Sequence, residues 1–168
     1  MSAIPGANDV IVNVNVNDQR QEKSNKVSSK KNGFGMEMAP ILANEDVTIT
    51  LRRAIEQELQ SRGFKIGNEA LVTVVADMTR FWNDHKVGFW SSDAVADLNM
   101  SVLLKNKNGN ILYSRNITTQ GVEPNNQLMT GENARLALDK ALANGMKILF
   151  DDPAFISALI EVSKTGSL

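Results

Sequence analysis

The chain of 168 residues contains a single histidine, His85, which is its only side chain with an ordinary pKa near neutral pH. A catalytic triad or a histidine–carboxylate relay could be built only around His85, and a two-histidine metal site could not be built at all. This histidine lies in the polar run Asn83-Asp84-His85-Lys86, whereas a catalytic histidine needs positioned partners. We therefore interpret His85 as a surface-loop residue without a catalytic role.

Pairs of carboxylates are the next candidates for chemistry. The pairs are Asp151 with Asp152, Glu45 with Asp46, and Asp93 with Asp97. The first two pairs stand at expected helix starts, where acids cap free amide groups and stabilise the helix dipole. No acid has the spacing of a calcium loop, and the absence of cysteine excludes thiolate metal sites and cysteine nucleophiles. We expect no catalytic residues, no metal, no cofactor and no enzymatic activity.

Two aromatic pairs bracket one connection between strands. They are Phe81, Trp82, Phe89 and Trp90. In one interpretation the rings pair across the base of a hairpin and cover the end of the core. In the other they form an aromatic rim for a protein or lipid surface, because aromatic residues dominate binding hot spots. These four rings are the candidate partner contact; a net charge of −1 and the lack of a basic stripe beside them argue against nucleic acid.

The elements that must position these residues are predicted by periodicity. Alternating valines and asparagines predict a strand over Val10–Val16. An apolar stripe every four residues predicts a helix over Val47–Arg62, with Gly63 as its left-handed cap. The remaining expected elements are strands over Ala70–Phe81, Ala94–Lys105 and Ile111–Gln120, a helix capped by Thr130 that runs to about Phe150, and a short helix from Pro153.

The expected fold class is α+β, with a mainly antiparallel sheet of about four strands and two to three helices packed on one face. A right-handed crossover would lay the first strand parallel to a neighbour. The last three strands should form an antiparallel meander with a solvated outer face. We expect a single domain over residues 10–163, a disordered N-terminal remnant over residues 1–9, a mobile basic loop over residues 18–32, and a flexible tail over residues 164–168.

The order of these motifs resembles the YajG family of bacterial lipoproteins over about residues 10–163. The resemblance is carried by Asp18-Gln19-Arg20, Arg62-Gly63-Phe64 with Gly67, Lys107-Asn108-Gly109-Asn110, and Val122 before an alanine-rich helix. It implies a lipobox cysteine, a lipid anchor and a compact α/β domain in the periplasm, without catalytic residues to carry over. Asp18 and Arg20 should form an ion pair, worth about 0–1 kcal/mol unless it is buried.

The chain has no lipobox cysteine and no signal peptide, and no window approaches the roughly 18 consecutive apolar residues of a membrane-spanning helix. Either Met1 is native to a cytoplasmic protein, or it replaces processed precursor sequence. The resemblance implies the second. We then expect the chain as given to be soluble, and the native precursor to be lipid-anchored on the periplasmic side of the envelope, at the outer membrane.

These observations lead us to expect a non-catalytic periplasmic domain of a cell-envelope lipoprotein, acting as an accessory protein-binding component with envelope proteins as partners. The alternative is a small-ligand or lipid-binding module, which would need an apolar pocket of about 300 Å³ or more. A hydrolase that uses an acid with His85 is a third hypothesis. The oligomeric state stays open.

Overall fold

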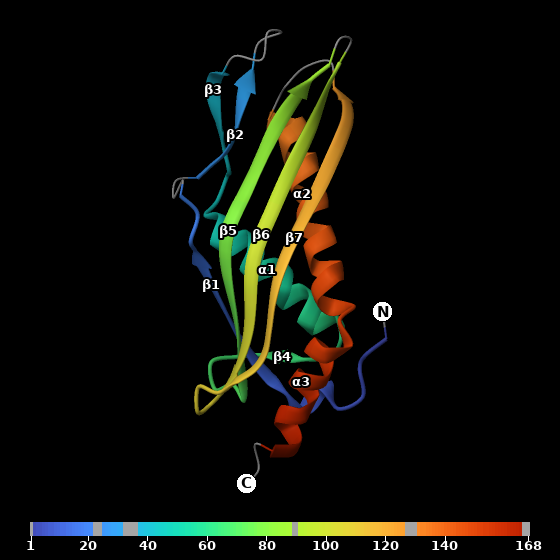
Figure 1. Ribbon diagram of the computed structural model, residues 1–168. Helices are drawn as coiled ribbons and strands as arrows, with labels where there is room; N and C mark the ends of the chain where they lie inside the picture. Colours follow the sequence, from blue (N-terminus) through green and yellow to red (C-terminus); the bar gives the residue numbers. More distant parts are fainter. Residues whose placement is uncertain (1, 22–24, 32–36, 89–90, 127–130, 166–168) are drawn as a thin grey trace.

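The structure, a computed structural model, describes residues 2–21, 25–31, 37–88, 91–126 and 131–165. Figure 1 shows its elements, which are η1 (Ala7–Asp9), β1 (Ile11–Asp18), β2 (Lys26–Lys31), β3 (Glu37–Leu42), α1 (Val47–Ser61), β4 (Lys65–Ile66), β5 (Val72–Val87), β6 (Ser92–Asn106), β7 (Ile111–Asn126), α2 (Gly131–Phe150) and α3 (Pro153–Thr165). Within these described ranges, no helix is long and apolar enough to cross a membrane.

The main sheet has five strands in the order β4-β1-β5-β6-β7. β5, β6 and β7 form the antiparallel meander that the sequence predicts. β1, however, runs parallel to both of its neighbours, β4 and β5. The expectation of a mainly antiparallel sheet of about four strands was wrong: the sheet is larger and mixed. Parallel neighbours need a crossover connection, and α1 supplies it between β1 and β5.

The helices α1, α2 and α3 cover the same face of the sheet (Figure 1), which confirms the α+β class with three helices. The core lies between them and the strands. Its largest fully buried side chains include Leu51, Ile55 and Leu59 from α1, Leu98 and Leu104 from β6, Ile117 from β7, Leu149 from α2, and Phe155 and Leu159 from α3. This continuous core fixes which strand faces are turned away from solvent.

The helix α1 begins and ends where its sequence predicts. Asp46 is the N-cap, and its carboxylate accepts hydrogen bonds from the backbone N–H of Thr48 at 2.9 Å and from the Thr48 hydroxyl at 2.8 Å. These bonds lower the pKa of Asp46. Gly63 takes the left-handed conformation with φ of 97°, and the Phe64 N–H bonds back to the Leu59 carbonyl at 3.1 Å.

The strands β2 and β3 form a separate antiparallel hairpin. The expected mobile loop over residues 18–32 was therefore wrong for Lys26–Lys31, which make up β2. Val27, the one apolar residue of that stretch, is 3% exposed. The hairpin lies beside the part of β5 that β1 does not pair with (Figure 1), and its burial there explains why a polar segment is ordered.

Residues 2–9, expected from the sequence to be disordered, lie against the domain. The Ile4 N–H donates to the Arg62 carbonyl at 2.9 Å. Ala7, in η1, is fully buried. These contacts tie the segment before β1 to the end of α1.

Candidate functional site

A β-bulge in β5 decides the position of the only histidine. The register between β5 and β6 shifts between Met78 and Arg80. Before the shift the even-numbered residues of β5 are buried, and after it Phe81, Asn83 and His85 are buried instead. His85 is 1% exposed and lies in a strand, so its interpretation as a surface-loop residue was wrong. The extra residue of the bulge turns the side chains of Asn83 and His85 inward.

The buried residues Asn83 and His85 attach the hairpin to the main sheet. The Ser28 hydroxyl donates to the Asn83 carbonyl at 2.7 Å and accepts from the Asn83 side-chain amide at 3.0 Å. The His85 ring nitrogen Nδ1 lies 3.2 Å from the Ser29 carbonyl oxygen. Because a carbonyl only accepts, Nδ1 donates in this bond. His85 therefore has a structural contact with β2.

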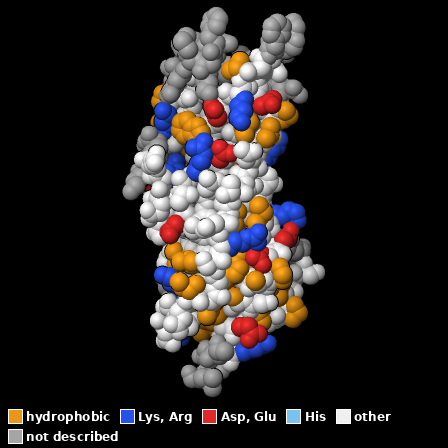
Figure 2. All heavy atoms as spheres, in the orientation of Figure 1, with side chains coloured by type: hydrophobic (Ala, Val, Ile, Leu, Met, Phe, Trp, Pro, Cys, Tyr) orange, Lys and Arg blue, Asp and Glu red, His pale blue; other side chains and the backbone are white. Residues whose placement is uncertain are grey.

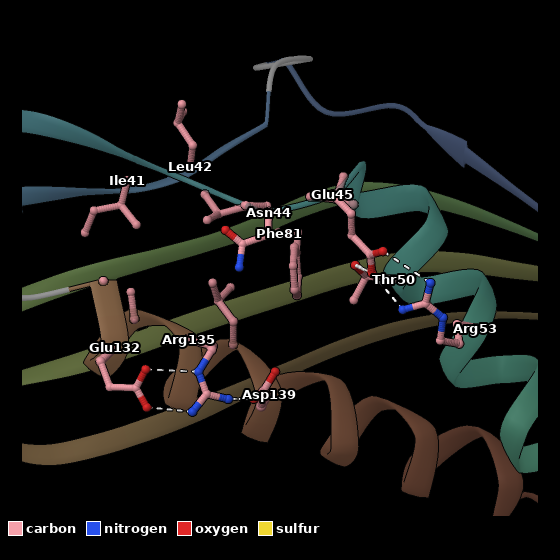
Figure 3. A pocket seen from close by; sticks show the side chains of 16 residues that line it. Ile41, Leu42, Asn44, Glu45, Thr50, Arg53, Phe81, Glu132, Arg135 and Asp139 are labelled. Atoms are coloured by element: carbon pink, nitrogen blue, oxygen red, sulfur yellow. Dashed lines mark hydrogen bonds and ion pairs between the residues drawn. The ribbon is translucent and has the colours of Figure 1, made fainter.

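A cleft of about 570 Å³ opens between the hairpin, the first turns of α1 and the first turns of α2 (Figure 3). Its floor consists of apolar residues that are themselves buried, namely Val27, Val47, Phe81, Ala134 and Leu138. At its edge Leu42, the last residue of β3, exposes 60% of its surface. The cleft thus combines an apolar floor with an exposed apolar side chain beside it.

On one side of the cleft, Arg53 of α1 binds both carboxylate oxygens of Glu45 (Figure 3). Its Nη1 lies 3.0 Å from Oε1 and its Nη2 lies 3.2 Å from Oε2. The Thr50 hydroxyl donates to the same Oε1 at 2.9 Å. This two-point pairing orients the carboxylate at the rim of the cleft.

On the other side, Arg135 of α2 bridges two acids of its own helix (Figure 3). It binds Glu132 at 2.6 and 3.2 Å and Asp139 at 2.9 Å. The hydrogen bonds from Arg135, followed by its charge, lower the pKa of Glu132. Glu132 and Asp139 stand three residues before and four residues after Arg135, and opposite charges at these spacings pair on a helix. This spacing is the signal from which the sequence could have predicted the ion pairs.

The cleft is lined by apolar and charged side chains. Its charged lining residues are Glu45, Arg53, Glu132, Arg135 and Asp139. The acids outnumber the arginines, and His85 is not among the lining residues. In the part of the chain that the structure describes, no cluster of three or more His, Cys, Asp or Glu side chains could hold a metal ion. A ligand with an apolar group for the floor, and with hydrogen-bond donors or positive charges for the carboxylates at the rim, would be complementary to this cleft.

The structure describes two of the four aromatic residues proposed as a partner contact, Phe81 and Trp82. Phe81 and Trp82 are neighbours in β5, so their side chains lie on opposite faces of the sheet. Phe81 is 6% exposed and forms part of the cleft floor. Trp82 is half-buried on the other face, with the Lys26 ammonium 5.5 Å from its ring centroid. Phe89 and Trp90 lie outside the described residues.

The expected ion pair of Asp18 and Arg20 is present and partly buried. Arg20 binds both oxygens of the Asp18 carboxylate at 2.9 Å, and the two side chains are 5% exposed for Arg20 and 20% for Asp18. The Nη1 of Arg20 also donates to the Lys26 carbonyl at 3.3 Å. Because the Arg20 side chain is buried and the pair joins the end of β1 to the start of β2, this pair has a structural role.

Of the acidic pairs, Asp152 confirms the expected capping role most clearly. It accepts from the Ala154 N–H at 3.0 Å at the start of α3, from the Tyr113 hydroxyl at 2.7 Å and from Arg115 at 2.9 Å. Burial first, and then the bond to Asp152, raises the pKa of Tyr113 to about 12. The bond from Tyr113 is the largest cause that lowers the pKa of Asp152.

Comparison with solved structures shows that this fold occurs elsewhere. A protein from Xanthomonas campestris has a TM-score of 0.61 and 15% identity, with 99% of this chain and 94% of that chain covered. A Helicobacter pylori protein described as a putative neuraminyllactose-binding hemagglutinin homologue has a TM-score of 0.54 and 10% identity, with the same 99% and 94% covered. At these identities the likeness concerns the fold alone. A search of curated proteins finds no match.

The sequence was also compared with models of protein families. A model described as an uncharacterized lipoprotein matches residues 1–160, which is nearly the whole chain. This match is consistent with the YajG-like motifs of the sequence. The chain therefore belongs to a family of uncharacterized bacterial lipoproteins.

Proposed function

We propose that this chain is a non-catalytic, periplasmic domain of a cell-envelope lipoprotein, and that it binds a segment of another envelope protein in the cleft between the hairpin, α1 and α2. The observation that carries the proposal is the cleft itself, whose apolar floor lies between two ion-paired clusters, with Leu42 60% exposed at its edge. Exposed apolar surface rimmed by polar residues is typical of protein-interaction sites.

The placement of the reactive side chains supports a non-catalytic role. His85 is buried and bonded to a backbone carbonyl of β2. Asp46 and Asp152 cap helices, and Asp18 binds Arg20. General acid–base catalysis needs such groups to converge on a site that substrate can reach.

The excess of acidic groups around the cleft favours a partner segment with apolar and basic side chains. Glu45 and Asp139 are each bound by one arginine, and Glu132 shares Arg135 with Asp139. A lysine or arginine of the partner would add to these carboxylates without displacing an existing bond. Such rim charges contribute more to specificity and association rate than to affinity.

Site-specific photo-crosslinking tests this proposal in cells that express the full-length gene. A photoreactive residue replaces Leu42, at the edge of the cleft, and a matched control replaces Ile111, which is 59% exposed at the start of β7. We expect Leu42 to form a discrete adduct with one envelope protein and Ile111 to form none. Equal labelling at both positions would contradict a site at the cleft, and a cytoplasmic product on cell fractionation would contradict the envelope assignment.

The second candidate function is the binding of a small apolar ligand or lipid in the same cleft. It is favoured by the volume of about 570 Å³, which exceeds the roughly 300 Å³ that a ligand pocket needs. Native mass spectrometry of protein purified from envelopes distinguishes the two. A stoichiometric small-molecule mass shift, together with lipid rather than protein adducts at Leu42, would support the ligand and exclude the protein segment.

A further inference from the structure

Most of the strand β1 forms an open edge of the main sheet. Its partner on one side is β5, which pairs with residues from Val12 to Asp18. On the other side β4 pairs only with Ile11 and Val12. In Figure 1, β1 forms the left margin of the sheet above β4. Among the described residues, no strand pairs with β1 on this side between Asn13 and Asp18.

The hydrogen bonds of β1 show which backbone groups face the open edge. The carbonyls of Val10 and Val12 accept from Lys65 and Gly67, on the β4 side. The carbonyl of Ile11, by contrast, accepts from Leu71, on the β5 side. Because residues of a strand alternate in the side to which their N–H and C=O point, the backbone groups of Val14 and Val16 face the open edge.

Side chains of α2 cover part of the opposite edge of the sheet, near the end of β7. On β7, the Val122 carbonyl accepts from the Lys140 ammonium at 2.9 Å, and the Gln120 carbonyl accepts from the Asn144 amide at 2.7 Å. Folded proteins commonly protect edge strands with lysine, proline or bulges. The strand β1, with the sequence IVNVNVND, contains no lysine, proline or bulge.

We propose that the open part of β1 pairs with the same segment of a second copy of this chain, in antiparallel register about a twofold axis at Asn15. The segment Asn13-Val14-Asn15-Val16-Asn17 reads the same in both directions. A twofold interface requires such self-complementarity. Val14 of each copy would exchange hydrogen bonds with Val16 of the other, and only amide side chains would meet on the outer face.

The charges and the shape around this edge fit a second copy. Asn13, Asn15 and Asn17 carry no charge, and an amide can both donate to and accept from another amide. A groove of about 410 Å³ runs between β1 and α1, lined on the helix by Thr48, Ile49 and Arg52. Ile49 exposes 36% of its surface. The twofold axis would bring Ile49 of both copies toward the same groove.

The strand β4 limits the length of the pairing stretch. In the proposed register Asp18 of one copy lies opposite Val12 of the other, next to β4. That strand contributes Lys65, which is exposed. Because β4 already occupies the edge beside Ile11 and Val12, pairing is confined to Asn13–Asn17, and about four backbone hydrogen bonds form. We therefore expect a weak, reversible dimer that has to be trapped to be measured.

Cysteine trapping tests the register directly, because the chain has no cysteine of its own. In antiparallel pairs the residues that do not exchange hydrogen bonds have Cα atoms about 4.5 Å apart, which lies within the range of about 4.4–6.8 Å for disulfides. Asn15→Cys should therefore form a disulfide-linked dimer under mild oxidation. The matched control is Thr118→Cys, an exposed outer-face residue of the other edge strand, β7.

A mixed experiment separates this pairing from random collision. Asn13→Cys and Asn17→Cys, each alone, should give little dimer, whereas their mixture should give a heterodimer identified by mass, with at least a tenfold higher yield. Adding Asn15→Lys to both chains should abolish it, because like charges would face each other. The proposal is overturned if Asn15→Cys dimerises no faster than Thr118→Cys, or if the single variants dimerise as well as the mixture, which would indicate parallel or non-specific contact.

Discussion

The replacement of Gly121 by alanine would test the closest approach between α2 and the sheet. Gly121 lies in β7, where a Cβ atom would sit 2.2 Å from the Ala137 carbonyl oxygen and 2.3 Å from the Ala141 backbone nitrogen. Ordinary contact with such atoms begins at 3.4 Å. Both neighbours belong to the backbone of α2, so the clash cannot be relieved by the rotation of a side chain. The helix or the strand must move.

The size of the effect follows from this geometry. Overpacking a core typically costs about 1–3 kcal/mol, and more where nothing can give. We expect the free energy of unfolding to fall by about 3 kcal/mol or more, at the upper end of that range. For a domain of this size each kcal/mol lowers the melting temperature by about 2–4 °C. The Gly121→Ala protein should therefore melt at least roughly 6 °C below the wild type.

The matched control is Gly145→Ala, in the interior of α2. Its Cβ would lie 2.9 Å from Cδ2 of Leu98, the flexible end of a side chain. Alanine also favours a helix over glycine by about 1 kcal/mol, so we expect a change of less than about 1 kcal/mol in either direction. Urea denaturation followed by circular dichroism measures both. The reasoning is refuted if Gly121→Ala is as stable as the wild type, or if both variants lose the same stability.

Asp46→Ala removes the N-cap of α1 and should lower the free energy of unfolding by about 1 kcal/mol, while Asp46→Asn, which still accepts a hydrogen bond, should lose less in the same urea titration. Ser28→Ala strands the buried amide of Asn83 and should cost about 1–3 kcal/mol, with faster hydrogen exchange in β2 as the local readout. Tyr113 is the only tyrosine, so its ultraviolet titration should report a pKa of about 12 in the wild type and a lower value in Asp152→Asn. The hydrogen bond from Tyr113 lowers the pKa of Asp152 in the folded protein. The stability due to this carboxylate should therefore be present above its unfolded pKa of about 4 and should vanish as the pH falls through its folded pKa. Urea midpoints of the wild type and Asp152→Asn, compared at acid and neutral pH, check this.

The sequence predicted the elements whose pattern is local. The apolar stripe of Val47–Arg62, with Asp46 before it and Gly63 after it, contains its own start and stop signals, and α1 follows them closely. The turn at Gly109 has the positive φ of 82° that an Asn-Gly pair favours. The ion pair of Asp18 and Arg20 also followed from spacing alone.

The candidate site could not be predicted in the same way. Its floor joins Val27 and Phe81 to the first turns of two helices, which lie far apart in the sequence. Phe81 and Trp82 are adjacent in the sequence, but the side chains of adjacent residues in a strand point to opposite faces of the sheet. The cleft therefore depends on how the hairpin and helices meet over β5, and no local pattern contains that information.

By itself, the sequence determined the α+β class, the antiparallel meander and the boundaries of the helices, because hydrophobic period and capping residues act over a few neighbours. Only the tertiary structure decided that β1 has β4 as a second parallel neighbour and an open edge beyond it, that a bulge after Met78 turns His85 into the interior, and that β2 supplies its hydrogen-bond partner. Alternation specifies which residues share a face of a strand. The alternation of apolar and polar residues does not specify which strand lies beside a given strand, because strand order depends on contacts between segments distant in the chain. Figure 2 shows charged and hydrophobic side chains lying next to one another on one face of the molecule.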